Sequence, residues 1–75
     1  MDERIKRTMS LVLGVPAETI GEDASPATIR TWDSLRHMNL ILALEEEFDI
    51  RFDDHQVTRL QSLLSLRAAI AAKTS

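Results

Sequence analysis

The sequence contains no cysteine, and this absence excludes several kinds of chemistry. Without cysteine the chain can form no disulfide, no thiolate metal site and no catalytic thiol of its own. Glu22 and Asp23 are neighbouring carboxylates, but two carboxylates without further oxygen ligands at loop spacing do not make a metal site, and we expect no metal. Any thiol chemistry would therefore have to be added to the protein.

Aromatic residues and positive charge are also scarce. One tryptophan and two phenylalanines give no platform on which bases could stack, and the net charge of −3 gives no basic patch. We therefore expect no binding to nucleic acid.

Long apolar runs are missing as well. The N-terminal residues MDERIKRTM are charged and lack the apolar run of a signal peptide, and no later stretch approaches the length of a membrane span. These features predict no membrane span and a cytoplasmic location.

The length of the chain limits what it can build. With 75 residues we expect a single domain, residues 1–75, whose small core leaves little margin of stability. A pocket that encloses a substrate and holds several catalytic groups would be difficult to form at this size. We therefore expect a scaffold with one functional point, and not an enzyme.

Residues 32–48, WDSLRHMNLILALEEEF, contain the clearest helical pattern in the chain and predict a helix from Ser34 to about Phe48. When residues are placed 100° apart around a helix axis, one apolar arc forms the expected core face. This arc consists of His37, Leu40, Ile41, Leu44 and Phe48. A second apolar stripe, on the side of Ser34, consists of Leu35, Met38 and Leu42. The second stripe is either covered by neighbouring segments or open as a docking surface.

Ser34 stands at the N-terminal end of this predicted helix, where a serine most often serves as a cap. The same position combines unpaired backbone N–H groups with the positive end of the helix dipole. It therefore also favours a bound or attached phosphate.

Asp33-Ser34-Leu35 alone occurs by chance in many proteins. Here it is followed by an apolar helix and then, at fixed spacing, by Leu44-Glu45-Glu46-Glu47-Phe48 and Ile50. This combination resembles the acyl carrier protein family, and the resemblance extends over nearly the whole chain. Together with the predicted elements, it implies an all-α fold with three main helices, one short helix and a long first loop.

The resemblance implies that Ser34 receives 4′-phosphopantetheine from coenzyme A, and that the thiol of this covalent arm holds an acyl group as a thioester. Asp33 would position the attachment site or contact the transferase. The implied partners are a phosphopantetheinyl transferase, a ligase or transferase that loads an acyl or aminoacyl group, and downstream enzymes of lipid or polyketide biosynthesis. The carrier itself is expected to be a monomer.

The chain departs from the family pattern at three positions. Thr31 replaces a glycine that many members have three residues before the serine, and Arg36 and Asn39 replace acidic residues two and five places after it. We expect Leu35 and Met38 to make apolar contacts with partner enzymes, and Arg36 and Asn39 to make polar ones. Because Arg36 would repel a strongly basic partner surface, we predict service in a dedicated pathway in preference to housekeeping fatty-acid synthesis.

The residues before Ser34 predict one further helix and a long loop. The helix begins near Asp2, which can cap it, and ends at Gly14 and Pro16. Its apolar positions are Ile5, Met9, Val12 and Leu13. Residues 15–33 have no sustained period and are predicted to form a loop with one brief helical turn at residues 17–20. Ile20, Ile29 and Trp32 are the side chains expected to fix this loop to the helices.

The residues after Phe48 predict two more helices. Ile50 and Phe52 alternate with polar residues but have no partner strand, so we expect them to be loop side chains anchored in the core. Asp53 or Asp54 caps a short helix with Val57 and Leu60 facing inward. Ser62 caps a last helix with Leu63, Leu66 and Ile70 on its inner face, which is expected to fray through Ala71, Ala72 and Lys73.

Three alternatives stay open. An aminoacyl or peptidyl carrier would use the same arm. A non-carrier helical module would bind a partner helix along the second stripe, with Ser34 only a cap. A small hydrolase would use Ser34 as nucleophile and His37 as base, but no orienting acid or oxyanion hole is evident, so we favour a histidine at the edge of the core or on the docking surface.

The acidic run at the end of the central helix consists of Glu45, Glu46 and Glu47. These side chains are expected to be solvated, although they could meet a basic partner.

Overall fold

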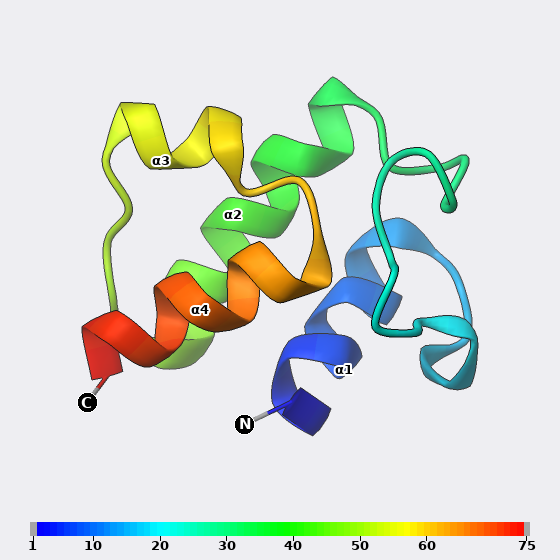
Figure 1. Cartoon of the computed structure of the whole chain (residues 1–75), viewed down its shortest axis with the longest axis horizontal. Coiled ribbons are helices and arrows are strands. Elements are labelled where there is room, and N and C mark those ends of the chain that lie inside the picture. Colours follow the sequence, from blue (N-terminus) through cyan, green and yellow to red (C-terminus); the bar gives the residue numbers. More distant parts are fainter. Residues whose placement is uncertain (1, 75) are drawn as a thin grey trace.

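Four α-helices and one short 3₁₀-helix form the regular structure of residues 2–74, the part of the chain that the computed structural model describes (Figure 1). They are α1 (Asp2–Leu13), η1 (Ala17–Thr19), α2 (Ser34–Phe48), α3 (Asp54–Arg59) and α4 (Leu63–Thr74). No residue in this range belongs to a strand, and no helix in it is long and apolar enough to span a membrane. The predicted all-α fold, with three main helices, one short helix and a long first loop, is confirmed.

The core is built from the apolar faces of the three longer helices. Each face repeats at helical spacing, as the sequence predicted. The side chains without exposed surface are Ile5, Met9 and Leu13 of α1, Leu40 and Leu44 of α2, and Leu63, Leu66 and Ile70 of α4. Because these fully buried side chains all come from the three longer helices, the position of α2 is fixed by packing against α1 and α4.

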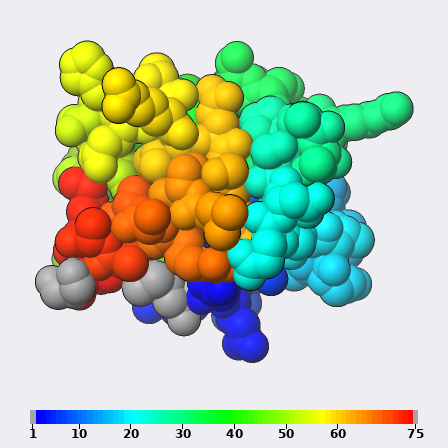
Figure 2. Space-filling model, in the orientation of Figure 1, coloured from blue at the N-terminus to red at the C-terminus, as the bar shows by residue number. Residues whose placement is uncertain are grey.

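The first loop, residues 15–33, is fixed to the helices at several points. Ile20, Ile29 and Trp32 are buried, which confirms all three predicted contacts, and Ala24 is buried with them. The Leu63 N–H donates to the Ala24 carbonyl oxygen at 3.0 Å, so this loop lies against the start of α4, where cyan and orange surfaces meet in Figure 2. The residues that lead into Ser34 are therefore held in place against the helices.

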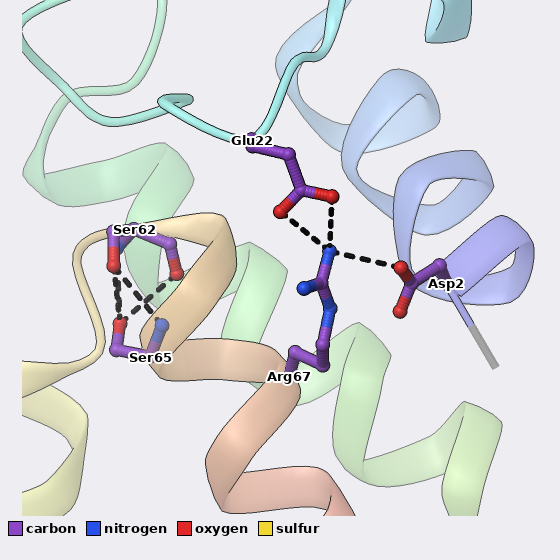
Figure 3. Close-up of polar contacts among 5 residues, drawn as sticks. All are labelled: Asp2, Glu22, Ser62, Ser65 and Arg67. Atoms are coloured by element: carbon purple, nitrogen blue, oxygen red, sulfur yellow. Dashed lines mark hydrogen bonds and ion pairs between the residues drawn. The ribbon is translucent and has the colours of Figure 1, made fainter.

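Arg67 of α4 joins three distant parts of the chain (Figure 3). Its Nη2 lies 2.8 Å from both carboxylate oxygens of Glu22 and 2.8 Å from Oδ2 of Asp2. The hydrogen bond to Glu22 and the charge of Asp2 raise the pKa of Arg67 above its ordinary value, against the opposing effect of desolvation. Glu22 is thus half of an ion pair, and the described residues contain no cluster that could hold a metal.

The start of α4 has a reciprocal cap. The Ser65 N–H donates to Ser62 Oγ at 3.0 Å, and the Ser62 N–H donates to Ser65 Oγ at 3.1 Å (Figure 3). Ser62 is therefore the cap that the sequence predicted.

At its C-terminal end, α4 continues to Thr74, whose hydroxyl donates to the Ile70 carbonyl oxygen. The expected fraying through Ala71, Ala72 and Lys73 was wrong.

The acidic run at the end of α2 is only partly solvated. Oε2 of Glu45 accepts a hydrogen bond from the Phe52 N–H at 2.8 Å, which holds the following loop against α2. Glu47 pairs with Arg4 of α1 at 2.9 Å, and the Arg4 guanidinium also lies 4.4 Å from the centre of the Phe48 ring. The expectation of solvation holds for the exposed Glu46 and Glu47, the latter within a surface ion pair, but was wrong for the half-buried Glu45.

The N-terminal end of α2 lies on the opposite side of the molecule from the first residues of α1 and the last residues of α4. In Figure 1, α2 begins at the upper edge, whereas α1 begins and α4 ends along the lower edge. Ser34 is thus placed away from Asp2 and Thr74.

Candidate functional site

Asp33 is the residue that caps α2. It has extended backbone geometry, and its Oδ1 accepts a hydrogen bond from the Arg36 N–H at 2.8 Å, while its Oδ2 lies 3.3 Å from Arg36 Nη1. The capping position thus belongs to Asp33 and not to Ser34, the residue that the sequence suggested as a cap. Ser34 is the first helical residue and is exposed. Its hydroxyl is therefore not needed to begin the helix.

We predict that Asp33→Ala lowers the free energy of unfolding by about 1 kcal/mol, because an N-cap of this kind contributes roughly that amount. Chemical denaturation followed by circular dichroism measures the change. Asp33→Ser is the matched control, since a serine hydroxyl can accept the same hydrogen bond and should retain most of the stability. Equal losses for both variants would contradict a capping role.

The backbone around Ser34 favours an anion. The Arg36 N–H is taken by the Asp33 side chain and the His37 N–H by the Asp33 carbonyl oxygen. The N–H groups of Ser34 and Leu35 have no acceptor one turn earlier in the helix and point outward at the positive end of the helix dipole. A phosphate on the Ser34 hydroxyl would lie in this favourable field.

A cleft of about 450 Å³ opens beside Ser34. Its walls come from the first loop, the first turns of α2, and α3 with the segment after it. The lining residues are Pro26, Trp32, Asp33, Ser34, His37, Met38, Val57, Thr58 and Gln61. Asp33 is the only lining residue that carries a full charge when His37 is neutral. The size and position of this cleft could not be predicted from the sequence, because its walls come from separate segments of the chain.

His37 is buried at the back of this cleft, and both of its ring nitrogens are engaged. Nδ1 lies 3.0 Å from Nε1 of Trp32, and Nε2 lies 2.6 Å from the carbonyl oxygen of Val57. Neither nitrogen is left to take a proton from Ser34. The structure therefore gives no support to His37 as a base for Ser34, and the expected position of His37 at the edge of the core is confirmed.

The second apolar stripe of α2 is open. Leu35, Met38 and Leu42 are 72%, 48% and 56% exposed, so no other part of the described chain covers them. Arg36 and Asn39 are also exposed. Of the two possibilities that the sequence left, the structure selects the open stripe, which extends along α2 from Ser34.

Sequence reasoning missed two contributors to this site. Trp32 was predicted as a core contact only, although its indole N–H holds His37, and Val57 contributes its carbonyl oxygen. A tryptophan five residues before a histidine has no recognised local signature, and a backbone carbonyl contact between α2 and α3 requires the tertiary fold.

The family model described as the phosphopantetheine attachment site matches residues 3–70. The match covers every helix from near the start of α1 to Ile70 of α4, and Ser34 lies near the middle of it.

Proposed function

Because this chain belongs to the phosphopantetheine attachment site family, and is therefore a carrier that bears a covalent 4′-phosphopantetheine, we propose that Ser34 is the attachment residue of a single carrier domain, residues 1–75. One observation carries the proposal: Ser34 is exposed in the first turn of α2, while Asp33 performs the capping that would otherwise occupy a serine there. The gain in intact mass after incubation with coenzyme A, magnesium and a phosphopantetheinyl transferase tests it.

The chemistry expected of Ser34 is phosphoryl transfer. Its Oγ forms a new bond to the phosphorus of the coenzyme A pyrophosphate that bears the pantetheine, and the bond from that phosphorus to the bridging oxygen breaks, so that the adenosine bisphosphate part leaves. The hydroxyl proton passes to a base of the transferase. The chain has only two glycines and no phosphate-cradling loop, so it acts as substrate in this step.

The attached arm supplies a thiol that holds an acyl group as a thioester. An arm on Ser34 would extend from the exposed start of α2, and a docked enzyme would then meet the thioester at a high local concentration. The side chains of Trp32, Met38 and Val57 in the adjacent cleft support an acyl cargo, such as a fatty acyl or polyketide intermediate. Affinity for each enzyme should be modest, because the carrier must dissociate after each step.

We further propose that Leu35 and Met38 are apolar docking contacts and that Arg36 and Asn39 select partners of a dedicated pathway. Arg36 pairs with Asp33, the acidic residue next to Ser34, and both side chains are exposed, so this pair offers no net negative charge beside the open stripe. A strongly basic partner surface would therefore find no attraction there and would meet the positive guanidinium of Arg36.

The double exchange Arg36→Asp with Asn39→Glu is therefore expected to increase acyl transfer by housekeeping fatty-acid enzymes by roughly tenfold or more, since like charges across an interface are costly. Initial rates on loaded carrier measure the change. Arg7→Asp with Leu11→Glu on the exposed side of α1 makes the same change in net charge and is the control, expected to have little effect. No gain, or an equal gain in the control, would count against selection by Arg36 and Asn39.

A further inference from the structure

His37 is held in one tautomer by its two partners. The indole N–H of Trp32 can only donate, so His37 Nδ1 must accept, and the ring proton must lie on Nε2. Nε2 then donates to the Val57 carbonyl oxygen. The two rings are nearly parallel, with centroids 6.1 Å apart and 26° between their planes. The neutral imidazole is thus the form that satisfies both contacts.

These two hydrogen bonds connect the three walls of the cleft beside Ser34. Trp32 belongs to the first loop, His37 to α2 and Val57 to α3, and all three line the cleft. The helix α3 ends at Arg59, so the Val57 carbonyl oxygen lies in its last turn, where no helical N–H is available to it. The imidazole of His37 supplies the missing donor and joins α3 to α2.

The residues that line the cleft would leave a positive charge on His37 uncompensated. The first loop contributes Pro26, Trp32 and Asp33 to the cleft, and the Asp33 carboxylate is already paired with Arg36. From α3 and the segment after it come Val57, Thr58 and Gln61, which are uncharged, and no residue of α4 lines the cleft. A proton on Nδ1 would point at the indole N–H of Trp32, and two donors cannot bond to each other.

We propose that His37 is a positioning residue that holds the walls of the cleft beside Ser34 together when neutral and releases its Trp32 wall when protonated. Protonation of His37 would release only one wall of the cleft. The contact to Val57 keeps its donor and becomes charge-assisted, so α3 stays in place. Only the first loop loses its bond to α2. The proposal goes beyond attachment of the arm. It rests on the proposed function only in that the cleft lies beside the residue proposed to carry the arm.

The unmodified chain, labelled with ¹⁵N, provides the test. Trp32 is the only tryptophan, so it gives a single indole N–H resonance. As the pH is lowered from about 8 to about 5, its chemical shift should change together with the ring ¹⁵N shifts of His37. Its protection from exchange with water, corrected for intrinsic rates, should fall on the order of tenfold, as expected for the loss of one hydrogen bond.

Two histidine variants separate this effect from general acid sensitivity. His55 is exposed on α3, so His55→Gln removes the other histidine and should leave the pH response intact. His37→Asn keeps an acceptor near the position of Nδ1 without an ionisable ring, and should remove the response. The ring ¹⁵N shifts of the unaltered chain at about pH 8 give an independent reading that needs no variant, and they should show the proton on Nε2.

Three results would overturn the proposal. They are a proton on Nδ1 at about pH 8, an indole signal that does not follow the His37 titration, and global unfolding before His37 is protonated. Because the unmodified chain is used, each of these results is independent of whether Ser34 receives the arm. Failure of the transferase assay would in turn leave the His37 measurement unaffected.

Discussion

Ser34→Ala is expected to abolish the gain of one phosphopantetheine group while leaving the fold nearly unchanged. The hydroxyl is the only atom of Ser34 that could form the bond to phosphorus, so its removal should eliminate loading completely. The stability of α2 does not depend on that hydroxyl, because Asp33 supplies the hydrogen bond to the first turn. We expect a change in the free energy of unfolding within about 0.5 kcal/mol, as for an exposed substitution.

Intact mass spectrometry after incubation with coenzyme A, magnesium and a broad-specificity transferase measures the loading. Ser62→Ala is the matched control, because Ser62 is a true helix cap at the start of α4. Its loss should lower the free energy of unfolding by about 1 kcal/mol and leave loading intact. Loading of the Ser34→Ala variant, or a loss of loading in Ser62→Ala while that variant stays folded, would contradict the assignment of Ser34.

Leu40→Ala should have the largest effect on stability. The Leu40 side chain has no exposed surface and lies on the core face of α2. Removing its three outer carbons leaves a cavity and costs about 2–5 kcal/mol. A domain of this length has roughly 4–11 kcal/mol of stability in total, so this single substitution should remove a large part of it. Denaturant unfolding monitored by circular dichroism gives the measurement.

Leu42→Ala provides the comparison on the same helix. Leu42 lies only two residues away but is 56% exposed on the open stripe, so its truncation should change stability by less than about 0.5 kcal/mol. If the stripe is a docking surface, Leu42→Ala should instead slow acyl transfer to partner enzymes. A loss of stability as large as that of Leu40→Ala would show that the two apolar stripes had been wrongly separated.

The elements of the fold could be predicted because their signals are local. The apolar repeat of α2 predicted both ends of the helix and separated its buried face from the stripe that stays open. The caps of α3 and α4 depend on residues three apart, Asp53 with Gln56 and Ser62 with Ser65. Signals of this range are visible in a sequence before any tertiary contact is known.

The parts that could not be predicted depend on contacts between distant segments. Nothing near Glu22 indicates that Arg67 will pair with it, because the two residues are 45 positions apart. The Arg4–Glu47 pair spans 43 positions in the same way. At the site, the sequence identified Ser34 as a candidate but not the cleft, since that space exists only after the first loop and α3 pack on either side of α2.

The separation of Ser34 from the ends of the helical structure determines how the protein can be immobilised. A chain anchored to a flat support near Asp2 or Thr74 would turn the start of α2 away from the support (Figure 1). Large enzymes in the overlying solution could then approach Ser34 without steric hindrance from the support. An anchor on the exposed part of the first loop would have the reverse effect, because that loop leads directly into Ser34. Orientation on a biosensor surface would thus decide whether transfer is observed at all.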